Sequence, residues 1–285
     1  SESEDLDKKT GLVKGRVITE NMKRTAVENI EKYYVEKGFR GAKVVIEEKN
    51  DPALPNSQNL VFNISKGNKV RINQLSFYGN EEVEELKLKS KMKGTKETTR
   101  LTLYPSVDSS SFGTHKRSSF DEYIKDWGFM SPTKTANYLD PYFRFKLFSS
   151  AKYNQTKYDE DKLKVLDYYN SLGFRDATIL ADTQYFTNKG NLNIDLKVDE
   201  GRRYYFGNIG WRGNTKYSDS ILTMLLGIKK GDIYNIQTLN KKLGKEMTPE
   251  GGDISGLYMD DGYLFFSVDA VETAVYSDTI DFEIR

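Results

Sequence analysis

Residues that could carry out acid–base, nucleophilic or metal chemistry are sparse in this sequence. The chain has one histidine, His115, and no cysteine, so disulfides and thiolate metal sites are excluded. His115 stands in a serine-rich stretch without a second ligand type nearby, which indicates an exposed structural residue. A P-loop, a complete GxGxxG fingerprint, an HExxH motif and a nucleophile elbow are all missing. The sequence therefore predicts no catalytic residue, no metal site and no cofactor.

Carboxylates are the remaining candidates for acid–base work. Two pairs fall where a helix is expected to start or end, so solvation and the helix dipole account for them. These pairs are Asp159 with Asp161 and Asp260 with Asp261. Three further carboxylates, Asp121, Glu122 and Asp140, lie in a long aromatic-rich segment. They leave open a second hypothesis, in which the chain is a hydrolase with its site in that segment.

Composition limits the classes of partner. The 285 residues include 43 basic and 42 acidic side chains, for a net charge of +1, so no overall field attracts nucleic acid or an anionic membrane. No apolar run approaches the roughly 18 to 20 residues that span a bilayer. The first residues, SESEDLDKKT, do not resemble a signal peptide. We therefore expect a chain that binds neither nucleic acid nor, by a helix of its own, a membrane.

A short junction occurs three times. Tyr34–Val44 reads YVEKGFRGAKV, Tyr169–Leu180 reads YNSLGFRDATIL and Tyr258–Val268 reads YMDDGYLFFSV. In each copy a tyrosine precedes a glycine by four residues and an aromatic follows the glycine. A glycine can take the left-handed conformation that closes a helix, where a side chain costs about 1 kcal/mol or more. The junction is therefore predicted to end a helix and start a strand.

A strand-like pattern follows each junction glycine. Apolar and mixed side chains alternate over Ala42–Glu47, Ala177–Asp182 and Phe266–Val271, which is typical of a strand with one buried face. A second alternating segment follows in each copy, at 60–64, 192–198 and 280–284, so three antiparallel hairpins are expected. The outward-facing positions of the first strands are Lys43, Val45, Glu47, Thr178, Leu180, Asp182, Ser267, Asp269 and Val271.

A second repeated block follows the hairpins. Gly67–Asn80 reads GNKVRINQLSFYGN and Gly201–Asn214 reads GRRYYFGNIGWRGN. Apolar positions 72, 75 and 77 match 206, 209 and 211, and this change of spacing from three to two predicts a bulged strand. Helical patterns follow each block and also precede the junctions, as at Met22–Tyr34 and Asp159–Leu172. The complete unit reads strand, helix, helix, strand, strand.

This order and these phrases resemble the polypeptide-transport-associated (POTRA) domain. The resemblance is carried by INQLSFYGN and IGWRGN, by YYNSLGF and YMDDGY, and by VDEG at the end of a unit, and it covers nearly the whole chain. It implies an α+β fold of tandem POTRA domains, each β-α-α-β-β with a small three-stranded mixed sheet covered by two helices. The expected domains are 1–67, which lacks its first strand, 68–201, which carries an insert at about 95–153, and 202–285.

The resemblance also implies a function. Such tandems form the periplasmic arm of outer-membrane β-barrel assembly factors, where they bind unfolded outer-membrane protein segments and accessory assembly lipoproteins without catalysis. A membrane-embedded C-terminal barrel, absent from this chain, would supply the only membrane contact. The periplasmic arm of a related protein-translocating transporter is the alternative. In the family's sheet order, the strand after the junction glycine lies at an edge, so the outward-facing positions given above are expected to bind clients by strand addition.

The insert has two interpretations. It contains many aromatic residues, among them Tyr104, Phe120, Trp127, Tyr138 and Phe148, which is too aromatic for a solvated linker. Most of it is therefore expected to be packed. Either it covers its own domain, or it forms a dedicated contact surface for a partner.

Overall fold

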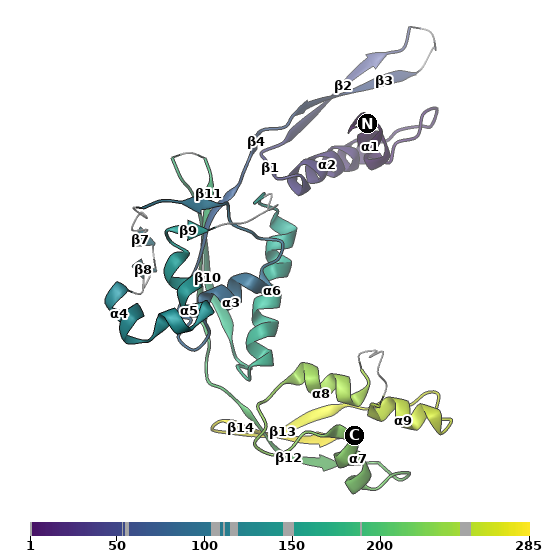
Figure 1. Cartoon of the computed structure of the whole chain (residues 1–285). Coiled ribbons are helices and arrows are strands. Elements are labelled where there is room, and N and C mark those ends of the chain that lie inside the picture. Colours follow the sequence, from purple (N-terminus) through teal and green to yellow (C-terminus); the bar gives the residue numbers. More distant parts are fainter. Residues whose placement is uncertain are drawn as a thin grey trace. The chain divides into compact units, whose positions relative to one another are not determined.

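The chain, described here from a computed structural model, forms two compact units (Figure 1). The described residues are 2–52, 54, 57–103, 109–110, 112–114, 119–144, 151–188, 190–245 and 252–285. One unit contains residues 1–76, 85–162 and 182–196, and the other contains 77–84, 163–181 and 197–285. This division crosses the second repeat, so the three domain boundaries expected from the sequence stay a prediction.

The first repeat is a helix packed on a hairpin. Helix α1 (Glu2–Thr10) precedes α2 (Glu20–Glu36), and Thr19 caps α2 by accepting from the N–H of Met22. The stripe predicted on α2 is buried, because Ala26, Ile30, Tyr33 and Tyr34 face inward. Strands β2 (Lys43–Asn50) and β3 (Gln58–Ser65) form the expected antiparallel hairpin. The short strands β1 (Phe39–Arg40) and β4 (Asn68–Lys69) pair beside it.

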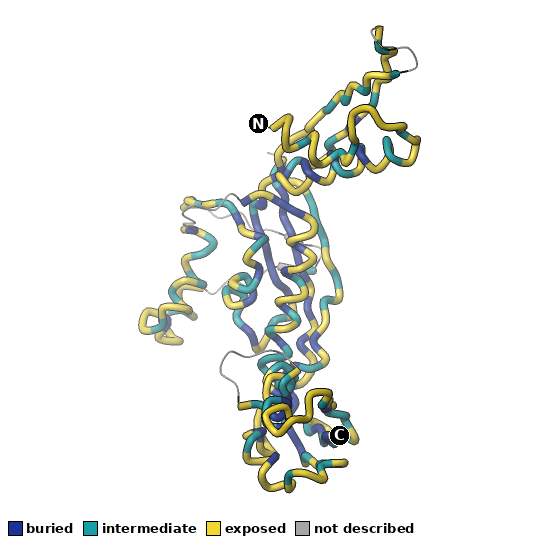
Figure 2. Tube along the Cα trace, turned by 90° about the vertical axis from the view of Figure 1, so that its right-hand side faces the viewer, coloured by how far each residue is buried: buried dark blue, intermediate teal, exposed yellow. Residues whose placement is uncertain are grey.

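The second repeat is built on a three-stranded sheet. Its strands are β10 (Thr178–Phe186), β11 (Leu192–Asp199) and β5 (Ile72–Tyr78), in the order β10-β11-β5. Helices α3 (Glu85–Lys91) and α6 (Gln155–Ser171) belong to the same repeat. Figure 2 shows buried residues running along these strands, and the bulged-strand positions Ile72, Leu75 and Phe77 are all at most 2% exposed.

The glutamate of VDEG explains why that phrase ends a repeat. Glu200 is buried, and its carboxylate accepts hydrogen bonds from the backbone N–H groups of Glu81, Glu82 and Val83 at 2.7–3.1 Å. Burying a carboxylate is tolerated when several donors satisfy it. Glu200 therefore fixes the turn that follows strand β5.

The insert contains short elements only. They are β6 (Arg100–Leu101), β7 (Ser109–Ser110), β8 (Gly113–Thr114), α4 (Phe120–Lys125), the 3-10 helix η1 (Gly128–Met130), α5 (Pro132–Leu139) and β9 (Phe143–Arg144). Strand β6 pairs with β9, and β7 pairs with β8. His115 and the aromatic residues Tyr104, Phe145 and Phe148 lie outside the described residues.

The third repeat shows the expected fold most clearly. It contains β12 (Tyr205–Trp211), α7 (Asp219–Leu226), α8 (Ile236–Leu243), α9 (Ile254–Asp260), β13 (Ala270–Tyr276) and β14 (Thr279–Ile284). The sheet order is β12-β14-β13, with β12 parallel and β13 antiparallel to β14. The register shifts between Phe206 and Ile209, where the bulge was predicted. The predicted α+β class with small mixed sheets is confirmed.

The junction glycines take the predicted backbone conformation. The φ angles of Gly38, Gly173 and Gly262 are +86°, +95° and +90°, in the left-handed region that favours glycine. Helices α2, α6 and α9 each end two residues earlier, at Glu36, Ser171 and Asp260. The prediction of a helix stop at this motif is confirmed in all three copies.

The strand after the third junction begins later than predicted. We expected it at Phe266–Val271, but β13 starts at Ala270 because its partner β14 reaches only to Ile284. Phe266 stacks on Tyr258 with ring centroids 4.0 Å apart, and Val268 is buried. The alternation in this segment therefore reflects packing against the core, without a partner strand.

Trp211 tests the core of the third repeat. It is only partly buried against that core, and its Nε1–H donates to Thr223 Oγ1 at 2.8 Å. The roughly 3–5 kcal/mol expected for replacing a fully buried tryptophan with alanine is therefore too large. We expect Trp211→Phe to lower the free energy of unfolding by about 0.5–1.5 kcal/mol, mostly through the lost hydrogen bond. Thr223→Val is the matched variant in a urea double-mutant cycle, and strictly additive losses would contradict this assignment.

Candidate functional site

The β10 edge of the second sheet is the candidate site. In the order β10-β11-β5, strand β10 lies at one side. The predicted outward residues Thr178, Leu180 and Asp182 are exposed along it, with Leu180 at 58%. Asp182 accepts from Lys162 of α6 at 3.0 Å, which ties the strand to its covering helix. The structure thus presents the three residues on one exposed face of an edge strand.

The opposite edge of the same sheet is bonded by residues of the insert region. The Ile72 N–H donates to the carbonyl of Ala151 at 2.8 Å, and the Ile72 carbonyl accepts from the N–H of Thr98 at 2.8 Å. The Leu75 N–H donates to Glu97 Oε1 at 2.9 Å. Backbone groups that would otherwise pair with another strand are satisfied at these positions. The insert region therefore covers part of β5, which supports the first interpretation given for it.

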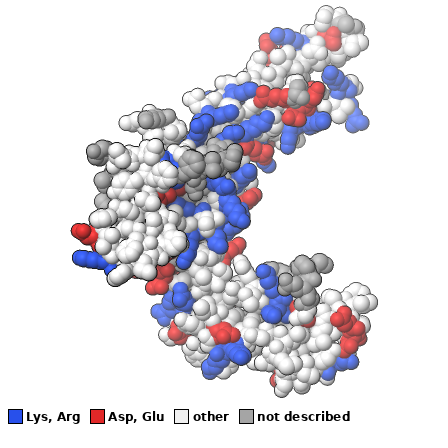
Figure 3. Space-filling model, viewed as in Figure 1, with Lys and Arg blue, Asp and Glu red and all other residues white. Residues whose placement is uncertain are grey.

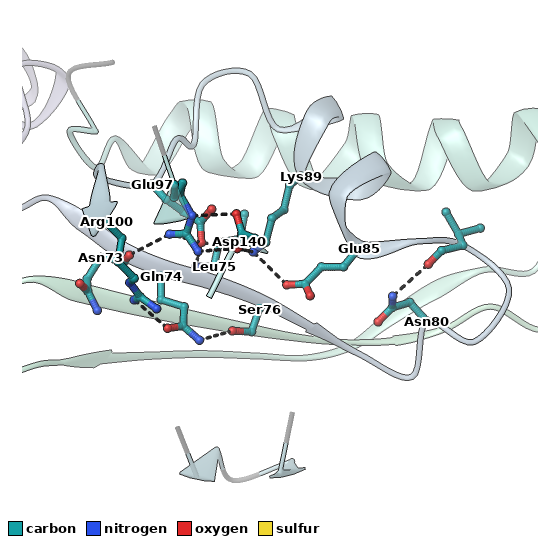
Figure 4. A network of polar contacts seen from close by, with 12 residues as sticks. Asn73, Gln74, Leu75, Ser76, Asn80, Glu85, Lys89, Glu97, Arg100 and Asp140 are labelled. Carbon is teal, nitrogen blue, oxygen red and sulfur yellow. Dashed lines mark hydrogen bonds and ion pairs between the residues drawn. The ribbon is translucent and has the colours of Figure 1, made fainter. Parts of the chain in front are cut away.

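A buried cluster of charges attaches the insert to this edge (Figure 4). Arg144 donates from Nε and Nη2 to both carboxylate oxygens of Asp140, at 3.0 and 2.7 Å, and its Nη1 lies 2.9 Å from Glu97 Oε1. Lys89 Nζ from α3 lies 3.0 Å from Glu85, 3.3 Å from Glu97 and 3.6 Å from Asp140. Figure 4 shows these groups converging beside β5, so strand, helix and insert meet at one point.

The charges in this cluster stabilise one another. Burial by itself would lower the pKa of Lys89, but the carboxylates of Glu85, Glu97 and Asp140 outweigh it and raise the pKa above its ordinary value. The pKa of Arg144 is raised in the same way, because burial is outweighed by the bond from Asp140 and the charge of Glu97. Both cations therefore stay charged at neutral pH, and the cluster stays intact.

Sequence reasoning missed this cluster because its members are distant in the chain. The only local signals are the i, i+4 pairs Glu85 with Lys89 and Asp140 with Arg144, which are common on exposed helices. Nothing in their spacing indicates that Glu97 joins the two pairs. Only the folded arrangement shows that these charges form one site.

The insert also exposes apolar side chains. Figure 3 shows few charged side chains over the face formed by α4, η1 and α5. Phe120, Trp127, Phe129 and Met130 are more than half exposed there. The expectation that most of the insert is packed is therefore wrong for this face. Both interpretations of the insert keep support, since one side covers β5 and the other is open.

The outward positions of the other two copies differ. Lys43, Val45 and Glu47 are exposed on β2, whose sheet has two strands. Ser267 and Asp269 precede β13, and Asp269 binds Lys245. Val271 lies on β13 but is partly buried. The third copy therefore presents its predicted residues less regularly than the second.

The carboxylates considered for catalysis have structural partners. Glu122 closes a capping box with Ser119 at the start of α4, beside Asp121, and Asp140 binds Arg144. Asp161 is not at a helix start, as expected, because α6 begins at Gln155; it is buried and accepts from the N–H of Gly94 at 2.7 Å.

The Asp260–Asp261 pair lies at the end of α9, as predicted. Tyr217 donates to Asp261, and this bond raises the pKa of Tyr217 to about 12 and lowers the pKa of Asp261. Among the described residues, no group of three His, Cys, Asp or Glu side chains could hold a metal ion. Nor does any helix among them have the length and apolar character needed to cross a membrane.

Comparison with known proteins identifies the family. The POTRA family model, described as surface antigen variable number repeat, matches residues 1–67, 70–201 and 204–285. The chain therefore belongs to the POTRA family, and the resemblance inferred from its repeated phrases is confirmed.

Individual relatives are more distant. The chain is similar to the outer membrane protein assembly factor BamA of Neisseria meningitidis serogroup B, with 34% identity over 102 residues, which is 35% of this chain and 13% of that protein. The chain thus matches only a small part of that relative's length.

Two solved structures align with nearly the whole chain. One is POTRA domains 3–5 of BamA from Haemophilus influenzae, with 15% identity, a TM-score of 0.45, and coverage of 99% of this chain and 89% of that one. The other is POTRA domains 1–3 of the periplasmic domain of Omp85 from Anabaena, with 14% identity, a TM-score of 0.31, and coverage of 98% and 87%. Likenesses this distant carry no further argument.

The charge cluster gives a testable prediction. Arg144→Ala leaves Glu97 and Asp140 buried without their main cation, so we expect it to destabilise the second repeat by about 3–5 kcal/mol and to speed amide exchange over 119–144. Lys134→Ala, at a half-exposed position of the same insert, should change stability by less than about 0.5 kcal/mol. Urea unfolding and hydrogen–deuterium exchange measure both. Unchanged exchange over 119–144 in the Arg144 variant would show that the cluster does not hold the insert.

Proposed function

We propose that this chain is a non-enzymatic periplasmic scaffold that binds extended segments of unfolded outer-membrane proteins by strand addition to β10. The observation that carries the proposal is the asymmetry of the second sheet. Residues of the insert region bond one edge, at β5, whereas β10 lies at the other edge with an exposed outward face. An edge strand offers a row of backbone donors and acceptors to an extended peptide.

The length of β10 fits one strand of a membrane barrel. It has nine residues and spans about 30 Å at roughly 3.3 Å per residue. A transmembrane β-strand has about 9–11 residues. A client segment of that length would pair along the whole of β10, and no longer surface is needed to bind one strand.

The side chains of β10 suit an alternating client. Leu180 and Phe186 are exposed apolar residues on the same face as Thr178 and Asp182. The strands of membrane barrels alternate apolar and polar residues. One face of a client strand would therefore meet Leu180 and Phe186, while backbone hydrogen bonds supply affinity that does not depend on client sequence.

The remaining predicted positions belong to the same proposal. Strand β2 offers Lys43, Val45 and Glu47 beside an edge, and the third copy offers Val271 on the edge strand β13, with Ser267 and Asp269 just before it. Because two of these three residues lie outside β13, we expect weaker client binding there than at β10. Accessory assembly lipoproteins are the second class of partner that we propose.

Proline substitution tests strand addition. Neighbouring residues of a strand point their N–H groups to opposite sides, so of Leu180→Pro and Ala181→Pro one removes an outward donor and the other breaks the pairing with β11. We expect the first to keep the native circular dichroism spectrum and to weaken binding of a peptide from an outer-membrane barrel strand by about ten-fold or more.

A side-chain variant and a map of contacts complete the test. Thr178→Ser keeps every backbone donor and should bind the peptide as the parent does. Photo-cross-linking from the peptide should label residues 178–186. Labels confined to helices or to the insert would refute binding at β10, and equal binding by the folded proline variant would do the same.

A further inference from the structure

The C-terminal end of α2 is held by a set of contacts that recurs later in the chain. The carbonyl of Gly38 accepts from the N–H of Val70 at 3.0 Å. The carbonyl of Glu36, the last residue of α2, accepts from Nδ2 of Asn154 at 3.3 Å. Lys69, just before Val70, places its Nζ over the ring of Phe39 at 5.0 Å. Three groups of the second repeat thus bind the first junction.

The end of α6 is held in the same way by the third repeat. The carbonyl of Gly173 accepts from the N–H of Tyr204 at 2.8 Å, and the carbonyl of Ser171 accepts from Nδ2 of Asn235 at 3.2 Å. Arg203, just before Tyr204, stacks over the ring of Phe174 at 4.8 Å. Donors, acceptors and cation occupy corresponding positions at both junctions.

Each asparagine joins two helix ends. Besides binding the preceding helix, Asn154 accepts from the N–H of Lys157 at 2.9 Å, and Asn235 accepts from the N–H of Thr238 at 2.9 Å. These bonds satisfy free donors at the starts of α6 and α8. One amide therefore serves the end of one helix and the start of the next, a contact called here the asparagine bridge.

The junction glycines are packed where a bridge is present. A Cβ at Gly38 would lie 2.9 Å from the Cβ of Lys152, and one at Gly173 would lie 2.8 Å from Cγ2 of Ile233. Lys152 and Ile233 each stand two residues before the bridging asparagine. The glycine is therefore needed for close approach of the next repeat as well as for its positive φ.

The third junction has the same backbone and an open surface. A Cβ at Gly262 would meet nothing within 4 Å. The Gly262 carbonyl accepts from the N–H of Leu264 at 3.0 Å, as that of Gly173 does from Arg175, but no second donor reaches it in the part of the chain that the structure describes. Around it, Tyr263 is 49%, Leu264 71% and Phe265 99% exposed.

From this correspondence we infer that the end of α9 is a docking site for a further unit of the same repeat. The occupant presents a Lys or Arg that stacks on Tyr263, a backbone N–H that binds the Gly262 carbonyl, and an asparagine at a helix start that binds the Asp260 carbonyl. Leu264 and Phe265 replace Arg40 and Gly41 of the first junction, and Arg175 and Asp176 of the second. The surface that covers them is therefore apolar.

An extended client strand does not fit this site. The acceptors are carbonyls at a helix end, and β13, the edge strand of the same repeat, starts only at Ala270. The two occupied junctions use one backbone donor, one side-chain amide and one cation, which an unpaired strand does not supply. The inference does not rest on the proposed client binding, and it makes different residues important.

An extended chain tests the inference directly. Appending a second copy of residues 200–285 after Arg285 places the copied Tyr204 as far beyond Ile284 as Tyr204 stands beyond Val198. We expect amide exchange over 262–266 to slow by about ten-fold or more relative to the parent chain. Asn235→Ala in the appended copy alone, or Phe265→Ser, should remove most of that protection. Tyr276→Ser, an exposed position at the far end of β13, should leave it unchanged.

The parent chain supplies an independent readout. Asn235→Ala in the parent should speed exchange at Gly173 and Phe174, and Asn154→Ala should do so at Gly38 and Phe39. Unchanged exchange in both would overturn the asparagine bridge, even if the appended unit failed to fold. Protection confined to β13, or an appended unit that leaves 262–266 unprotected, would overturn the docking site.

Discussion

The rest of the structure depends on the backbone of three glycines. At Gly38, Gly173 and Gly262 the chain takes a positive φ that other residues adopt only at a cost, and a helix ends two residues before each one. This turn directs the chain from a covering helix into the sheet. At the first two glycines it also leaves room for the next repeat to approach the helix end. Helix length, the start of the following strand and the contact between repeats are thus set at one position in each copy.

Sequence reasoning worked where a local pattern has one structural solution. The glycine of YVEKGF can close a helix without strain, and the three-then-two spacing of Phe206, Ile209 and Trp211 predicts the bulge that the register shows. It failed where the partner decides the outcome. Phe266 and Val268 alternate like a strand, but β14 does not extend far enough to pair with them. The Glu97 cluster and the asparagine bridges join residues distant in sequence, so no window of the chain contains their signal.

The charge cluster makes the insert part of its repeat. Arg144 and Glu97 are each at most 4% exposed, and ions so buried are costly unless every charge is matched. The match requires Lys89 from α3 and Asp140 and Arg144 from the insert in one arrangement. Apolar packing would tolerate several alternative positions of the insert, whereas this network is satisfied in only one. The exposed aromatic face of α4 and η1 is thereby held in a defined orientation on the repeat.

The partial covering of β5 has a consequence for self-association. A sheet with two open edges can be extended on both sides, and identical chains can then polymerise edge to edge without limit. Here Ala151, Thr98 and Glu97 occupy hydrogen-bonding positions along β5, so the second sheet can grow on the β10 side only. Two chains that met there would close a pair instead of starting a fibre. The same insert that stabilises the repeat therefore works as a chain terminator.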